Sequence, residues 1–166
     1  MKAPINGITI ILVLYEEKTS LIFRCLENIK NFKIIIVDNA GNISLKKNVI
    51  RGLHFQKKFS QHKIIFVLKG IINDFVVDIR KNSKTFSKVY NFTLTSGDAL
   101  IIPKGFAHGY SSLAKENIVI YFLSEDWYPN QESGIIWNDK FLNINWGVKK
   151  PIVSKKDKLL KTFLEL

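Results

Sequence analysis

The chain has 166 residues, of which 46% are hydrophobic and 12% aromatic; this length allows one domain with a single core, and this composition excludes intrinsic disorder. Lysine and arginine number 25 against 14 acidic residues, giving a formal net charge of +11. Only three of these cations are arginines. Because base and phosphate recognition relies on arginine, the charge favours a solvated lysine surface, and we expect no nucleic-acid partner.

The N-terminal segment, residues 1–43, differs in pattern from the rest of the chain. The apolar run at 8–15 predicts a strand, residues 21–29 show near-helical spacing, and 33–38 predicts a second strand. The first run leads directly into two glutamates with no small-residue cleavage site, so it is not a secretory signal. No apolar run approaches the roughly 18–20 residues needed to cross a bilayer, so we expect no membrane partner.

Residues 44–166 read as one β domain. Short β-type runs separated by turn residues recur about every ten residues, with no long helical segment between them: KIIFVL (63–68), DFVVDI (74–79), KVYNFTL (88–94), ALIIP (99–103) and NIVIYFL (117–123). This spacing favours an antiparallel sandwich or jelly roll over a parallel α/β sheet. The last segment, 155–166, is predicted to form a short amphipathic helix or an ordered tail. The single cysteine, Cys25, cannot form an internal disulfide, which favours a reducing, cytoplasmic location.

The sharpest motif is SGDALIIPKGFAHGY, residues 96–110. The spacing of Gly97, Pro103, Gly105 and His108 resembles the second conserved box of the cupin superfamily, in which a strand ends in a Pro/Gly turn and the next strand begins with an inward-facing histidine. The resemblance implies an all-β fold, a cupin-type jelly-roll β-barrel with a short α/β-like N-terminal segment.

The first cupin box often binds a metal through His-x-His and a following glutamate. The corresponding stretch here, 51–70, has Gln56 where the second histidine would stand and contains no glutamate. His54, His62 and His108 could in principle supply three nitrogen ligands, but they lack the His-x-His pair and the carboxylate. We therefore expect no metal.

Several further stretches follow one another in the order of a single cupin family: KKNVIRGLHFQ (46–56), DFVVDIRKNSKTF (74–86), IIPKGFAHGY (101–110), 121–129, GIIWND (134–139) and PIVSKKD (151–157). They resemble the dTDP-4-dehydrorhamnose 3,5-epimerases. The resemblance covers about 46–157 nearly without gaps, and it implies a dTDP-sugar substrate and a homodimer.

Epimerisation beside a ketone needs three groups and no redox cofactor. The carbonyl of a 4-keto sugar acidifies the hydrogens on C3 and C5, so the site needs a base, a stabiliser for the enolate oxygen and an acid on the opposite face. The resemblance implies that His54 is the base and that the carboxylate of Asp157 pairs with it. It likewise implies that Tyr121 is the acid and that Lys63 faces the enolate. The implied substrate contacts are Arg51, Gln56, His108 and Trp127.

The N-terminal segment departs from this family. Where the family carries an Arg-Gly arm that holds the nucleotide phosphates, EEKTSLIFR (16–24) has no Arg-Gly pair, and Arg24 stands where an acid is expected. Phe66 stands three residues after Lys63, where this family usually has an arginine. The stretch 7–42 also looks like the opening strand-helix-strand of family 2 glycosyltransferases, but it is too short for a nucleotide-binding domain.

Two alternatives follow from these departures. Residues 1–43 form either a degenerate epimerase arm or a fragment joined to the cupin domain by rearrangement of the gene. The second functional hypothesis is a catalytically weak or inactive cupin that binds sugar nucleotide or acts in assembly.

Overall fold

The computed structural model describes residues 45–125 and 128–166 in full and the backbone of 9–14 and 33–38. Trp127, Cys25 and most of the 7–42 stretch therefore lie outside the described residues. Nearly all regular structure is β, as predicted. The strands are β1 (Thr9–Leu14), β2 (Lys33–Asp38), β3 (Val49–Gln56), β4 (Lys63–Lys69), β5 (Ile71–Asp78), β6 (Val89–Thr95), β7 (Ala99–Ile102), β8 (Phe106–Ser112), β9 (Ile118–Leu123), β10 (Glu132–Gly134) and β11 (Ile152–Val153).

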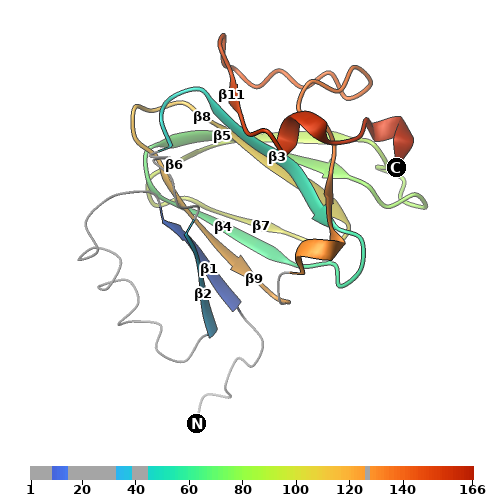
Figure 1. Ribbon diagram of the computed structural model, residues 1–166, viewed down its shortest axis with the longest axis horizontal. Coiled ribbons are helices and arrows are strands. Elements are labelled where there is room, and N and C mark those ends of the chain that lie inside the picture. The colour runs from blue at the N-terminus through green and yellow to red at the C-terminus, as the bar shows by residue number, and fades with distance from the viewer. Residues whose placement is uncertain (1–8, 15–32, 39–44, 126–127) are drawn as a thin grey trace.

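The strands form two sheets that face each other (Figure 1). The first sheet has the order β2-β1-β9-β4-β7, and the second has the order β10-β3-β8-β5-β6, with β11 pairing with β3. All five β-type runs predicted after residue 44 form strands of this sandwich. Most neighbours in each sheet are distant in sequence, since β3 pairs with β8 and β4 pairs with β7 and β9, all antiparallel.

One core fills the space between the two sheets. It contains Ile65 and Val67 from β4, Ile72 and Val76 from β5, and Val119 from β9. Because side chains alternate along a strand, every second residue of β4, β5 and β9 points into this space. Lys63 is in phase with Ile65, so the lysine predicted to face the enolate belongs to the inner face of the first sheet.

A second core covers the opposite face of the second sheet. There the C-terminal segment packs Ile135, Trp146 and Phe163 against Phe75 and Val77 of β5, and Figure 1 shows this segment on the side of β3 and β8 away from β4 and β7. The end of the chain is an ordered tail with two short 3₁₀ helices, η2 (Asp157–Leu159) and η3 (Phe163–Glu165), rather than an amphipathic α-helix. A further 3₁₀ helix, η1, spans Pro129–Gln131.

A bulge in β3 brings two functional candidates to one face. Arg51 pairs with Tyr110 of β8 and His54 pairs with His108, so three residues of β3 advance over two of β8. Without the shift, residues three apart would point to opposite faces. Gly52 lies inside the bulge at φ +94°, where a Cβ atom would come 2.5 Å from the carbonyl oxygen of His108. Only glycine fits this backbone position.

None of the helices in the described part of the chain has the length and apolar character of a membrane-spanning segment.

Candidate active site

His54, on the inner face of the second sheet, forms a close pair with Asp157 of the C-terminal segment. His54 projects from β3, and its Nε2 atom lies 2.7 Å from Oδ1 of Asp157 at the start of η2. The side chain of His54 is 26% exposed and that of Asp157 only 2%. The histidine can therefore meet a ligand, whereas the carboxylate is sequestered behind it.

The electrostatic surroundings of Asp157 keep it ionised. Burial opposes ionisation, but the hydrogen bond and the charge of His54, with smaller contributions from the Gly52 N–H and from Arg51, hold the pKa of Asp157 below its usual range. The N–H of Gly52 lies 3.3 Å from the second carboxylate oxygen, Oδ2. An ionised carboxylate only accepts hydrogen bonds, so Nε2 of His54 carries the hydrogen and Nδ1 is left as the basic atom.

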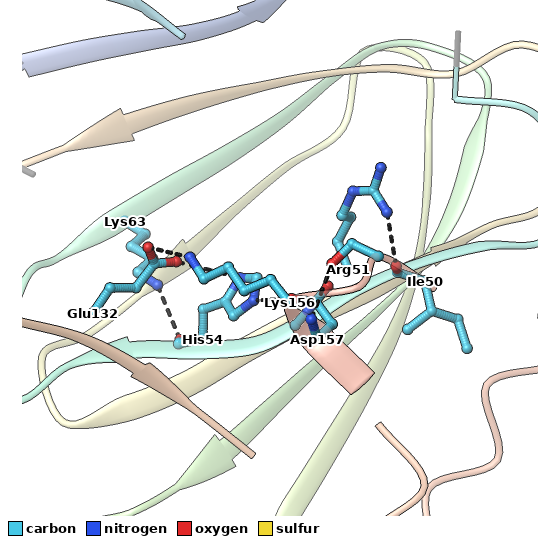
Figure 2. A network of polar contacts seen from close by, with 9 residues as sticks. Ile50, Arg51, His54, Lys63, Glu132, Lys156 and Asp157 are labelled. Carbon is cyan, nitrogen blue, oxygen red and sulfur yellow. Dashed lines mark hydrogen bonds and ion pairs between the residues drawn. The ribbon is translucent and has the colours of Figure 1, made fainter. Parts of the chain in front are cut away.

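Lys63 approaches His54 from the first sheet. Its Nζ atom donates a hydrogen bond of 3.2 Å to the carbonyl oxygen of His54, and Figure 2 shows the lysine on the side of His54 opposite Asp157. Burial lowers the pKa of Lys63 to about 8, although the negative charges of Glu132 and Asp74 oppose this fall. The site thus holds an ammonium group that is weakly hydrated and close to His54, the predicted base.

Glu132 joins the site from β10, which pairs with β3. Its Oε1 atom lies 3.9 Å from Nδ1 of His54, and its Oε2 atom accepts a hydrogen bond of 2.5 Å from Lys156 (Figure 2). The side chain of Glu132 is 15% exposed. Sequence reasoning gave this glutamate no role, because only the register of β10 on β3 brings it beside the histidine.

A second histidine–aspartate pair lies beside the first. Nε2 of His108 is 2.7 Å from Oδ2 of Asp74, and both side chains are buried. His108 lies directly across from His54 in the β3–β8 register, which places the two imidazoles on the same face of the sheet. The ring centroid of His108 is 5.9 Å from that of Tyr121, which projects from β9 of the opposite sheet. The predicted base and the predicted acid are therefore linked through His108.

The remaining predicted substrate contacts, Arg51, Gln56 and Trp127, differ in what the structure shows of them. Arg51 lies on β3, half-buried, and its charge acts on Asp157. Gln56, at the end of β3, is buried and its Oε1 atom accepts a hydrogen bond of 3.1 Å from the backbone of Tyr128, so its amide oxygen serves a structural contact. Trp127 lies outside the described residues.

The residues that sequence reasoning missed are Asp74 and Glu132. For Asp74 a signal existed: in DFVVDI it is in phase with the apolar Ile72 and Val76, and a carboxylate at a buried position of a strand indicates a partner. Among the described residues, no group of three or more His, Cys, Asp or Glu side chains is arranged to hold a metal ion.

Two facing, mainly antiparallel sheets with histidines on the inner face define a cupin-type jelly roll, and solved structures with this fold match the chain. A sequence model of the family described as dTDP-4-dehydrorhamnose 3,5-epimerase matches residues 23–165. The chain belongs to this family. The match begins N-terminal to the 46–157 stretch that carries the resemblance in the sequence.

Individual relatives agree with this assignment. The dTDP-4-dehydrorhamnose 3,5-epimerase of Shigella flexneri is 41% identical over 114 residues, which cover 67% of this chain and 63% of the relative. The Bacillus anthracis enzyme, solved with TDP and PPi bound, is 43% identical with a TM-score of 0.69, covering 72% of this chain and 70% of that one. The Legionella pneumophila enzyme, solved with dTDP-4-keto-L-rhamnose, is 30% identical with a TM-score of 0.70, covering 91% and 80%. The chain thus spans less than two thirds of the Shigella relative's length.

Proposed function

We propose that this protein epimerises a dTDP-4-keto-6-deoxyhexose at C3, at C5 or at both, without a cofactor. The observation that carries the proposal is the 2.7 Å contact between His54 and the sequestered carboxylate of Asp157, on the face that also receives Lys63. Family membership, the TDP bound to the Bacillus relative and the dTDP-4-keto-L-rhamnose bound to the Legionella relative support this substrate class.

In the first step, Nδ1 of His54 removes a proton from the carbon beside the ketone. The electron pair of the broken C–H bond moves into the ring, and the ketone oxygen becomes an enolate oxygen. The imidazolium that results has one hydrogen on each nitrogen. Asp157 stabilises this cation through the hydrogen bond at Nε2, as a carboxylate does in other histidine pairs.

Lys63 stabilises the enolate. A fixed ammonium in a site of low water content interacts more strongly with a developing oxyanion than it would in bulk water. Its hydrogen bond to the carbonyl of His54 places this positive charge next to the base. Lys63 thereby lowers the barrier to proton removal without taking up the proton itself.

Tyr121 completes the reaction from the opposite sheet. Its phenol donates a proton to the carbon on the face away from His54, which inverts the configuration and returns the electron pair to a C–H bond. The phenolate then regains a proton from solvent, and His54 releases the one that it took, so the enzyme is restored without net consumption. In this proposal Arg51 contacts a phosphate of the nucleotide, a group that a guanidinium fork binds well.

We also propose that the protein acts as a cytoplasmic homodimer, which family membership and the single cysteine of the chain support. Light scattering of the full chain should give twice the protomer mass, and a monomer at micromolar concentration would contradict this.

The function is tested by incubating the protein with dTDP-4-keto-6-deoxyglucose and identifying the sugar by NMR. We expect new signals from epimers at C3, C5 or both. Unchanged substrate after prolonged incubation would refute the enzymatic proposal and favour a binding role. The His62→Ala variant is a matched control, because His62 is exposed and lies outside the site.

A further inference from the structure

The carboxylate of Asp74 is held by one contact only. Asp74 is fully buried, and Oδ2 makes the hydrogen bond of 2.7 Å with His108. Its other oxygen, Oδ1, is the one buried side-chain polar atom in the described part of the chain with no hydrogen-bond partner. Asp74 therefore differs from Asp78 on the same strand, whose carboxylate is bound by Arg80, Ser83 and Thr85.

Such an arrangement is expensive for the fold. A buried donor or acceptor left unpaired costs about 1–3 kcal/mol, and more when it is charged. Apolar side chains that fill the same volume are often as stable as a buried ion pair or more so. The neighbours of Asp74 on the inner face, Ile72 and Val76, show that this face of β5 accepts apolar residues. The stability of the fold therefore does not explain why position 74 is an aspartate.

Asp74 has no exposed surface, so it cannot touch a substrate directly. Asp74 contacts His108, and His108 in turn neighbours both His54, the proposed base, and Tyr121, the proposed acid. The imidazole is the register partner of His54, and its ring meets that of Tyr121 edge to face, with the ring planes at 68°. The charge of Asp74 also acts on Lys63.

We propose that Asp74 is a positioning residue that fixes the tautomer and ring plane of His108, and through it the place of Tyr121 opposite His54. This inference rests on the proposed function. With Nε2–H donated to Asp74, the imidazole can neither rotate nor exchange its nitrogens, and its ring forms a rigid support for the phenol. Proton donation by Tyr121 depends strongly on this support. Proton removal by His54 depends on it less.

The test is a double-mutant cycle. Asp74→Asn keeps the volume and removes the charge, and we expect kcat/KM to fall on the order of 10- to 100-fold, the range that small misplacements of reacting groups produce. If Asp74 acts through His108, the double variant Asp74→Asn/His108→Asn should be within about threefold of His108→Asn alone. Asp78→Asn is the matched control, because it removes a buried carboxylate from the same strand outside the site, and it should retain kcat/KM.

A second readout separates positioning from folding. In D2O, Asp74→Asn should incorporate deuterium into unconverted substrate at a higher ratio to product than the wild type, because abstraction continues while reprotonation is impaired. An equal ratio, or additive losses in the cycle, would overturn the positioning role. If Asp74→Asn does not fold, ring ¹⁵N shifts of His108 in the wild type decide: hydrogen on Nε2 supports the inference, and a bare Nε2 overturns it. A wild type without any exchange would refute the proposed function itself, and this inference with it.

Discussion

The imidazole of His54 and the carboxylate of Asp157 meet at 2.7 Å although 103 residues separate them in the sequence. The bulge in β3 turns the histidine inward, and the C-terminal tail brings η2 behind it. Because Gly52 of the bulge also donates to Asp157, one local distortion of the strand sets both members of the pair. The predictions below follow from this geometry and from the groups around it.

Replacing Asp157 by asparagine should remove the fixed tautomer of His54. The comparable change in a serine-protease triad lowers kcat about 10⁴-fold, and we expect a loss on the order of 10³- to 10⁴-fold here, with little change in KM. Steady-state kinetics on dTDP-4-keto-6-deoxyglucose measure this. Asp98→Asn, in an exposed turn, serves as the control. A loss of less than tenfold would show that the pair does not operate in the reaction.

The pKa of Lys63 predicts an alkaline limit to activity. Because burial lowers this pKa to about 8, the ammonium is present below that pH, and kcat/KM should fall as the pH rises through it. Lys63→Arg keeps its charge at all these pH values and should move the limit upward, even though its maximal rate is lower. A pH–rate profile from 6 to 10 decides. If kcat/KM falls at the same pH in the wild type and in Lys63→Arg, a group other than Lys63 sets the alkaline limit.

The same pKa has a consequence for stability. Between about 8 and the ordinary value of 10.5, the unfolded chain holds the lysine proton and the folded protein does not. The unfolded state binds more protons in this window, so the contribution of Lys63 to the free energy of unfolding rises with pH there. Lys63→Met should abolish this rise in denaturant titrations at pH 8 and 10, whereas Lys58→Met, at an exposed position, should preserve it.

Tyr121→Phe should separate the two halves of the reaction. Without the phenol, we expect product formation to fall about 10²- to 10⁴-fold, as loss of a general acid commonly does, whereas deuterium exchange into substrate falls less. NMR of the sugar in D2O measures both rates in one sample. Tyr90→Phe, at a partly buried tyrosine on β6, controls for loss of a hydroxyl. Parallel loss of exchange and product would contradict the role of Tyr121 as the acid.

Asp78 is predicted to matter for stability rather than for catalysis. It is fully buried, and Arg80, Ser83 and Thr85 bind it at 2.6–2.7 Å. Asp78→Ala should lower the free energy of unfolding by roughly 2–4 kcal/mol, because it removes the buried partner of these three side chains. The loss is not larger because Arg80 is half exposed and water can hydrate it in the variant. Glu116→Ala, at an exposed ion pair with Lys69, should cost about 1 kcal/mol or less.

The pH dependence of the Asp78 effect has a defined sign. The hydrogen bond of Arg80 holds the pKa of Asp78 well below its usual range. The stabilisation is therefore present above the ordinary aspartate pKa and is lost as the pH falls towards the lowered one. The difference between wild type and Asp78→Ala should shrink on acidification, and a constant difference down to pH 2 would contradict the ion pair.

Much of the fold could be predicted because short stretches of sequence indicate each strand. Runs such as KIIFVL and NIVIYFL are short, apolar and rich in β-branched and aromatic residues, and both form strands of the first sheet. The pairing of His54 with Asp157 was reachable only through the family resemblance, since no local pattern links β3 with η2. The partner of His108 is hard to predict for a different reason: Asp74 lies within an apolar strand, and the strand pattern does not show which group a buried charge there contacts. Glu132 depends on strand register alone, which the sequence of β10 does not reveal.

The central claim is that His54 removes the proton, and exchange of hydrogen for deuterium at C3 and C5 of dTDP-4-keto-6-deoxyglucose in D2O measures this directly. We predict exchange by the wild type and by the His62→Ala control, and none above background by a folded His54→Ala variant. Equal exchange by His54→Ala and the wild type would contradict the account.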